Sequence, residues 1–244
     1  MPDLTWNARQ WSGDYEWPEA GEEWSEPWGG SEAQWFGSLY PRLHRFLPAS
    51  RILEIAPGHG RWTRFLIPAS DEYLGVDLNQ SCVDICKERF RDDARATFVA
   101  NDGVSLNAAE DGAYDLVFSF DSLVHAELDV FHGYVPEILR KLKPDGVAFI
   151  HHSNMAAGRL RAGEHHHSRA ESVAASAVAD IIRQHGGEVI VQETITWIDA
   201  HLLDGLTLFG RSGGRAAPPT LIENPDFGEE ALMIKRYQSA YSAV

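Results

Sequence analysis

The sequence predicts a doubly wound α/β fold, in which a mostly parallel sheet of seven strands is covered by helices on both faces. Three observations predict it. Short apolar runs alternate with helix-length segments, and the runs are apolar throughout, as in buried parallel strands. The chain has 244 residues with 44% hydrophobic content, which suffices for one large core. We therefore expect one main domain.

The predicted elements alternate along the chain. An apolar period near 3.6 residues predicts a helix over 31–47, interrupted near Pro41. The last two strands have no helix between them, which indicates an antiparallel hairpin at the far edge of the sheet. The expected strands are 51–56, 72–78, 96–102, 114–120, 146–153, 188–197 and 202–211. The other expected helices are 61–68, 81–90, 131–142 and 171–186.

Residues 1–35 differ in composition from residues 36–244. They hold six of the eight tryptophans and eight acidic residues against the single basic residue Arg9. We predict an N-terminal arm over 1–35 and the main domain over 36–244. Either the indoles pack on the domain surface, or the arm closes over a site or faces a sister subunit. An exposed apolar arm would favour a homodimer.

The overall charge restricts the class of partner. A formal net charge of −15 and the lack of Lys/Arg clusters argue against nucleic-acid binding. A neutral or carbohydrate-like acceptor, either a small molecule or an oligosaccharide, is easier to accommodate. The N-terminus has no basic start followed by an apolar segment, and no apolar run reaches membrane length. We expect a cytoplasmic protein without a membrane span.

The turn "EIAPGHGR" follows the first strand. Gly58 and Gly60 allow close approach of the backbone to a ligand, but Thr63 stands where a dinucleotide site has its third glycine. Glu54 precedes the turn, and Asp77 ends the second strand, where a carboxylate can accept both hydroxyls of a ribose. A further acid, Asp102, ends the third predicted strand and can accept from an adenine amino group.

The motifs "LEIAPGHG", "GVDL", "NDG" and "FSFDSLVH" together resemble those of class I S-adenosylmethionine-dependent methyltransferases, which have a Rossmann-like fold. The resemblance covers about residues 50–155 and implies S-adenosylmethionine as the cofactor. It places Asp121 near the sulfonium and the acceptor. The implied cofactor contacts are Glu54, Ala56, Gly58 and Gly60 at the turn, Asp77 at the ribose, Leu78, Asp102 and Gly103 at the adenine, and Asp121.

The acceptor site is expected just beyond the fourth and fifth strands, in "FDSLVHAELD" and "FIHHSN". His151 and His152 point to opposite faces of their strand, so at least one of them is structural. The other can remove the proton of a hydroxyl acceptor. We favour His152 as this catalytic base and keep His151 as the alternative.

The C-terminal half also resembles bacterial polysaccharide and glycoside O-methyltransferases, including those that act on actinobacterial methylmannose polysaccharides. The resemblance implies roles in the acceptor site for His152, His167, Arg169, Ser172 and Asp204, with Gly205 where a cysteine or a similar small residue is expected. Arg169 and Ser172 fit equally well as caps of the helix that follows. The resemblance leaves open a magnesium ion on Asp121 or Asp204. The histidines 165–167 fit a solvated loop better than a zinc site.

The leading hypothesis is therefore an S-adenosylmethionine-dependent enzyme that methylates a hydroxyl of a sugar, glycoside or polysaccharide. A first alternative is methylation of a nonsugar hydroxyl or an amine. A second is a noncatalytic cofactor-binding protein, which would not require a histidine pair at the end of the fifth strand.

Overall fold

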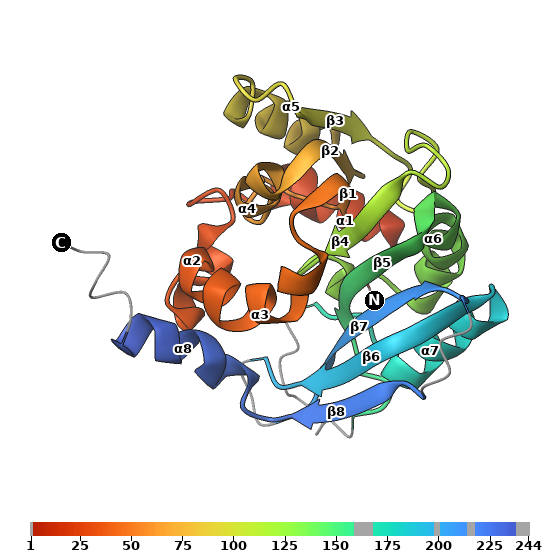
Figure 1. The fold of residues 1–244 in the computed structure, drawn as a ribbon. Coiled ribbons are helices and arrows are strands. Elements are labelled where there is room, and N and C mark those ends of the chain that lie inside the picture. The colour runs from red at the N-terminus through yellow and green to blue at the C-terminus, as the bar shows by residue number, and fades with distance from the viewer. Residues whose placement is uncertain (1, 159–167, 198–200, 214–217, 238–244) are drawn as a thin grey trace.

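The computed structural model describes residues 2–158, 168–197, 201–213 and 218–237. Within them it has one mixed sheet with the strand order β3-β2-β1-β4-β5-β7-β6-β8. The α/β class and the mostly parallel sheet are confirmed (Figure 1). The strands are β1 Ala49–Ile55, β2 Ser70–Asp77, β3 Ala96–Ala100, β4 Tyr114–Ser119, β5 Leu142–Ser153, β6 Gly187–Ile195, β7 Asp204–Arg211 and β8 Thr220–Asn224.

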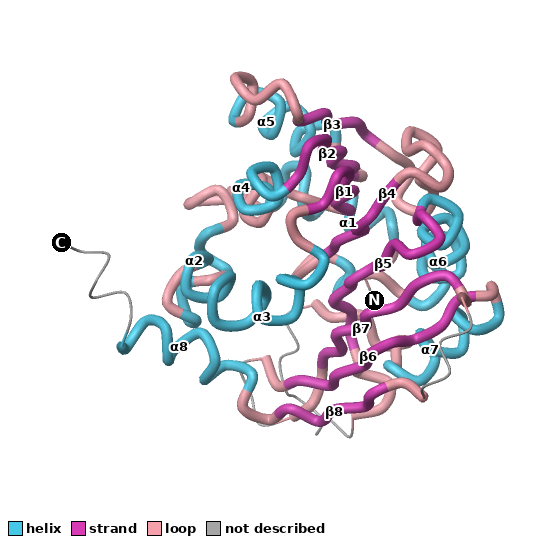
Figure 2. The backbone as a smooth tube through the Cα atoms, viewed as in Figure 1, coloured by secondary structure: helices cyan, strands magenta, loops and turns pink. Residues whose placement is uncertain are grey.

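Helices cover both faces of the sheet, as Figure 2 shows. The helices are α1 Leu4–Arg9, α2 Ser31–Gln34, α3 Tyr40–Leu43, α4 Thr63–Leu66, α5 Gln80–Arg89, α6 Leu128–Lys141, α7 Ala175–Gln184 and α8 Phe227–Tyr237. Because neighbouring strand residues point to opposite faces, Val117 of β4 belongs to the core cluster that includes α6 and α7, whereas Leu116 and Phe118 belong to the cluster that includes α3, α4, α5 and α8.

The expected antiparallel pairing of the last two predicted strands is confirmed in β6 and β7, but this pair does not form the edge of the sheet. β7 runs antiparallel between β5 and β6, and β8 forms the edge beside β6, parallel to it. The described sheet therefore has eight strands, where the sequence predicted seven. The strand pattern missed β8 because this edge strand is largely solvent-exposed, with Leu221 70% and Ile222 41% exposed, and so carries no core-facing alternation.

The N-terminal residues form short helices and turns that pack on the domain. Trp28 and Trp35 are 5% and 4% exposed and belong to the core that also holds Phe227 of α8. The predicted helix over 31–47 is present as α2, a π-helical turn, α3 and a 3₁₀ turn in succession. The proposed boundary after residue 35 therefore falls inside one helical run and stays a prediction.

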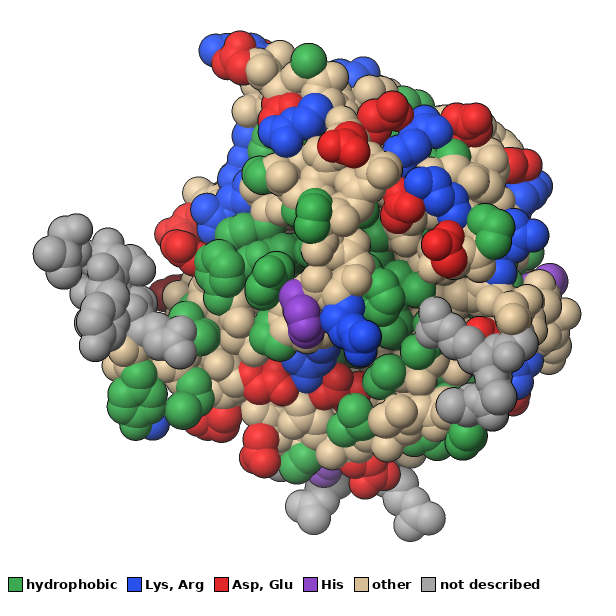
Figure 3. Space-filling view, in the orientation of Figure 1, with side chains coloured by type: hydrophobic (Ala, Val, Ile, Leu, Met, Phe, Trp, Pro, Cys, Tyr) green, Lys and Arg blue, Asp and Glu red, His purple; other side chains and the backbone are tan. Residues whose placement is uncertain are grey.

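The molecular surface mixes charges over the face shown in Figure 3. Acidic and basic side chains are interspersed there, while hydrophobic side chains gather beside α2 to α4 and at the outer end of α8. Phe36 and Tyr40 are 48% and 42% exposed, and Met233 and Tyr237 are 52% and 57% exposed. In the described part of the chain, every helix is too short or too polar to cross a bilayer.

Candidate functional site

The turn after β1 brings backbone groups to the carboxyl edge of the sheet. Ala56 and Gly58 both have left-handed backbones, with φ of 56° and 59°, and this conformation is costly for alanine. The Ala56 N–H donates to the Val76 carbonyl at 2.7 Å, and the Gly58 N–H donates to Asp77 Oδ2 at 3.0 Å. These bonds fix the turn between β1 and β2, beside the point where the strand order reverses.

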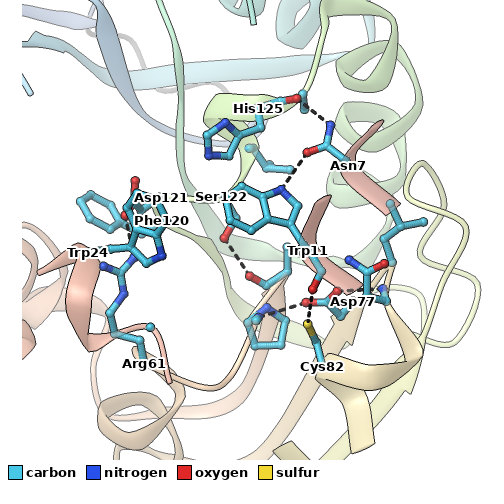
Figure 4. Close-up of a pocket in the computed structure, with 18 of the residues that line it drawn as sticks. Asn7, Trp11, Trp24, Arg61, Asp77, Cys82, Phe120, Asp121, Ser122 and His125 are labelled. Atoms are coloured by element: carbon cyan, nitrogen blue, oxygen red, sulfur yellow. Dashed lines mark hydrogen bonds and ion pairs between the residues drawn. The ribbon is translucent and has the colours of Figure 1, made fainter. Parts of the chain in front are cut away.

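A cavity of about 310 Å³ lies between this edge and the N-terminal segment (Figure 4). Its walls combine the ends of β1, β2 and β4 with residues from the first 27 positions of the chain. Six of the nine implied cofactor contacts line the cavity: Ala56, Gly58, Asp77, Leu78, Gly103 and Asp121. Arg169, expected in the acceptor site, lines it as well. The structure thus brings together residues that lie up to 113 positions apart.

Asp77 is 5% exposed at the end of β2 and faces the cavity. It accepts backbone hydrogen bonds from Gly58 at 3.0 Å and from Asn79 at 2.9 Å. Burial raises the pKa of Asp77 to about 6, although the two backbone hydrogen bonds oppose this shift. The carboxylate retains lone pairs that can accept from ligand hydroxyls, since each oxygen has two.

Glu54, Gly60 and Asp102 are not among the cavity-lining residues. Glu54 is buried beneath the turn and accepts from Tyr73 Oη at 2.5 Å and Thr63 Oγ1 at 2.7 Å; burial raises its pKa to about 7. A Cβ on Gly60 would lie 2.5 Å from the Phe90 ring, so this glycine serves helix packing. The assignment of all three residues to cofactor contact stays a sequence prediction that this geometry does not favour.

Asp102 was expected at the end of the third strand, but β3 ends at Ala100. Its carboxylate therefore stands in a loop and accepts from the backbone N–H groups of Val104 at 3.0 Å and Ser105 at 2.7 Å. It closes the loop that presents Gly103 to the cavity. These bonds lower the pKa of Asp102, although partial burial works against them.

Asp121 follows β4 in a left-handed conformation, with φ of 59°. Its carboxylate accepts from Arg61 Nη2 at 2.6 Å, and both side chains line the cavity. Its backbone N–H donates to His151 Nδ1 at 3.1 Å, which holds this strained residue in place. Arg61 lies within the glycine-rich turn, and the sequence analysis missed it because an arginine has no fixed position in that motif.

His151 is fully buried between the rings of Phe120 and Trp197, at centroid distances of 4.6 and 5.0 Å. Its Nε2 lies 3.1 Å from Asp204 Oδ2 without the geometry of a well-formed hydrogen bond. Asp204 also accepts two hydrogen bonds from Arg169, at 2.5 and 2.7 Å. Burial opposes ionisation of Asp204, but the Arg169 charge outweighs it and holds the pKa well below the usual range. His151 is not among the cavity-lining residues. Its role as the alternative base stays a prediction, and the geometry favours a positioning role behind the cavity wall.

His152, the favoured base, points into the opposite core. Its Nδ1 lies 2.8 Å from the Ser153 carbonyl and its Nε2 lies 2.8 Å from Thr207 Oγ1, so both ring nitrogens have partners. Burial lowers its pKa to about 4. A Cβ on Gly205 would lie 2.4 Å from this ring, which explains why a cysteine does not fit there. The base role of His152 stays a prediction, and the geometry favours a structural role.

The remaining acceptor-side residues take structural partners. Ser172 Oγ accepts from the Leu128 N–H at 2.9 Å, so it caps α6 and not the helix that follows it. His167 and the neighbouring histidines lie outside the described residues. Asp121 and Asp204, the two carboxylates considered for magnesium, are each paired with an arginine. Within the described ranges, no group of three His, Cys, Asp or Glu residues is arranged to hold a metal ion.

The N-terminal segment covers the cavity. The Trp17 ring stacks on His59 at 4.2 Å between centroids, and a Cβ on Gly58 would lie 2.9 Å from Trp17. Leu4 would similarly meet a Cβ on Gly103 at 2.8 Å. Both cavity glycines therefore lie directly beneath this segment. The tryptophan-rich composition of residues 1–35 was the feature of the sequence that indicated an arm packed on the domain or closed over a site.

Comparison with known proteins gives matches over the same region. Residues 52–146 match a family model described as a methyltransferase domain. The phthiotriol/phenolphthiotriol dimycocerosates methyltransferase of Mycobacterium tuberculosis (strain H37Rv) is 35% identical over 104 residues, which is 41% of this chain and 36% of that protein. The chain thus spans about a third of the length of the curated relatives it matches.

Solved structures share the fold at low identity. An S-adenosylmethionine-dependent methyltransferase from Clostridium acetobutylicum is 14% identical with a TM-score of 0.59, covering 77% of this chain and 92% of that one. The complex of DhpI with SAH is 17% identical with a TM-score of 0.57, covering 88% and 97%. The [4+2]-cyclase SpnF is 20% identical with a TM-score of 0.51, covering 66% and 57%. Residues 52–146 thus match a methyltransferase-domain model, and the chain has the same Rossmann-like fold as these solved structures.

Proposed function

We propose that the protein transfers a methyl group from S-adenosylmethionine to a hydroxyl of a sugar or glycoside. One observation carries the proposal: one cavity joins the glycine-rich turn at Ala56 and Gly58 and the Asp77 carboxylate to a second wall formed by Arg61 and Asp121. The first wall suits a nucleoside with its ribose hydroxyls, and the second suits a polar acceptor.

The residues present fit the cofactor. Asp77 offers carboxylate oxygens for ribose hydroxyls, and Leu78 supplies an apolar contact for an adenine ring. When bound, S-adenosylmethionine supplies a methyl group activated on a sulfonium. The task of this chain is to bind and orient the two partners and to exclude water.

The acceptor side of the cavity favours a neutral molecule with hydroxyls. Its arginines occur in close pairs, Arg61 with Asp121 at 2.6 Å and Arg169 with Asp204 at 2.5 Å, so their charges are largely compensated. Aromatic rings, which stack well on sugar rings, form much of the wall. The described tryptophans that line the cavity are Trp11, Trp17, Trp24, Trp62 and Trp197.

A nonsugar alcohol is a second candidate acceptor, because the curated relative is named for phthiotriol and phenolphthiotriol dimycocerosates. An amine is a third, because an N-methyltransferase NodS from Bradyrhizobium japonicum shares the fold at 16% identity and a TM-score of 0.55. Catalysis other than methyl transfer also occurs on this fold, as the cyclase SpnF shows. The acceptor must therefore be decided by assay.

The test has two stages. Calorimetry with S-adenosylhomocysteine examines the cofactor site, and no measurable binding would refute it. Incubation with methyl-labelled S-adenosylmethionine and matched panels of glycosides, long-chain diols and amines, read by mass spectrometry, then examines the acceptor. We expect a mass increase of one methyl group on glycosides. Methylation confined to the diols or the amines would refute the sugar acceptor, and binding without any transfer would favour a noncatalytic role.

A further inference from the structure

His125 occupies the acceptor wall of the cavity and was not singled out by the sequence. It ends the 3₁₀ turn Leu123–His125, which follows β4 within the loop that carries Asp121. Figure 4 shows its ring on the side of the cavity away from Asp77 and Cys82. The residue therefore lies opposite the wall assigned to the nucleoside.

The hydrogen bonding of His125 defines its tautomer. Nδ1 lies 2.8 Å from the backbone carbonyl oxygen of Ser168. A carbonyl oxygen only accepts, so Nδ1 carries the proton and a neutral ring has its lone pair on Nε2. No hydrogen-bond partner of Nε2 occurs among the residues that the structure describes. His152 differs in this respect, because both of its nitrogens are engaged.

The surroundings hold the His125 ring in one orientation. The Asn7 side chain donates to the His125 carbonyl at 2.8 Å, and the Ala170 N–H donates to the Val124 carbonyl at 2.8 Å. The ring also packs against Trp11 and Trp6, at centroid distances of 5.1 and 6.2 Å. A base held in this way can be positioned for its substrate before the substrate binds.

We propose that His125 Nε2 is the proton acceptor for the hydroxyl that is methylated. This inference rests on the proposed function and adds a catalytic residue to it. As the acceptor oxygen bonds to the methyl carbon, its O–H bond breaks and the proton moves to Nε2. The carbon–sulfur bond breaks at the same time and its electron pair stays on the sulfur, so charge and atoms balance. The imidazolium then returns its proton to water.

The electrostatics are compatible with this role. Burial lowers the pKa of His125 to about 4, so the ring is neutral at pH 7. Arg169 also disfavours the imidazolium, whereas Asp121 and Asp204 favour it. Trp6, Trp11 and Asn7 of the N-terminal segment also face His125 and carry no charge. A weak base suffices here, because a hydroxyl oxygen becomes strongly acidic as it acquires the methyl group.

The decisive variant is His125→Asn, because its amide N–H can replace the donor to the Ser168 carbonyl while no basic nitrogen remains. We expect kcat to fall by roughly 10²- to 10⁴-fold, the usual contribution of a positioned base, with affinity for S-adenosylhomocysteine within about threefold of wild type. The matched control is His132→Asn, at an exposed position of α6, which should retain wild-type kcat. In His125→Ala, added imidazole should restore part of the rate.

The outcomes separate this inference from the proposed function. If wild type methylates its acceptor and His125→Asn keeps kcat within threefold, His125 is not the base. If wild type transfers no methyl group to any acceptor, the proposed function fails instead. Should His125→Asn not fold, the pH–rate profile of wild type decides. This profile is measured at saturating S-adenosylmethionine, because protonation of Asp77 weakens cofactor binding as pH falls through 6. A loss of kcat/KM for the acceptor as pH falls towards about 4 supports His125, and a value that is flat down to pH 4 or falls already near pH 7 overturns it.

Discussion

Replacing Asp77 by asparagine tests the cofactor site with the least disturbance to the fold. Asp77 accepts from the backbone N–H groups of Gly58 and Asn79, at 3.0 and 2.9 Å. An asparagine oxygen can keep one of these bonds, whereas alanine would leave both buried N–H groups without their acceptor. Asp77→Asn therefore removes the charge while retaining part of the turn.

The expected magnitude follows from the charge. A hydrogen bond to a charged group contributes about 1.5 to 3 kcal/mol, so the Kd for S-adenosylhomocysteine should rise by roughly 10- to 150-fold. Burial raises the pKa of Asp77 to about 6, so wild-type affinity should decrease as pH falls through 6 and the carboxylate is protonated. The asparagine variant should lack this pH dependence.

Isothermal titration calorimetry between pH 5 and 8 measures both effects, with circular dichroism to confirm folding. The matched control is Asp84→Asn, because Asp84 is exposed on α5 and bonds to Gln80 at 2.7 Å. The control should bind like wild type at every pH. A folded Asp77→Asn variant with wild-type affinity would refute the assignment of the ribose site.

Other expected outcomes address the remaining elements. Asp102→Asn keeps an oxygen that can accept from the Val104 and Ser105 N–H groups, so it should leave the Kd for S-adenosylhomocysteine unchanged in calorimetry. A tenfold loss of affinity would restore the sequence expectation of an adenine contact. Asp204→Asn should lower the free energy of unfolding in urea by about 3 to 5 kcal/mol, because it leaves Arg169 buried without its charge partner. The control is Asp180→Asn at an exposed ion pair, and equal stability of the two variants would contradict this prediction. Deleting residues 2–20 should leave a folded protein with reduced acceptor turnover, and wild-type turnover would show that this part of the arm only packs on the domain. Deleting residues 2–35 should lower the melting temperature strongly, because Trp28 and Trp35 are lost from the core.

The sequence by itself predicted the α/β class, the alternation of strands and helices up to β5, and the cavity-lining residues Ala56, Gly58, Asp77, Leu78 and Gly103. These features are local: apolar runs of strand length, glycines at a turn and an acid at a strand end are all readable within a few residues. Asp77 could be assigned in this way because β2 ends at Asp77 itself. The same argument misplaced Asp102, because β3 ends two residues earlier and the exact end of a strand depends on its pairing with β2.

Only the tertiary structure decided the insertion of β7 beside β5, the edge strand β8 and the orientation of the histidines. Strand alternation shows that His151 and His152 point to opposite faces of β5. Which of them lies on the side of the cavity depends on what packs on each face of this strand. Phe120 and Trp197 enclose His151, whereas Thr207 of β7 binds His152. His125 lies in the stretch "FDSLVHAELD" that the sequence places near the acceptor, but its proposed role depends on the Ser168 carbonyl, 43 residues away, reaching Nδ1 through long-range packing.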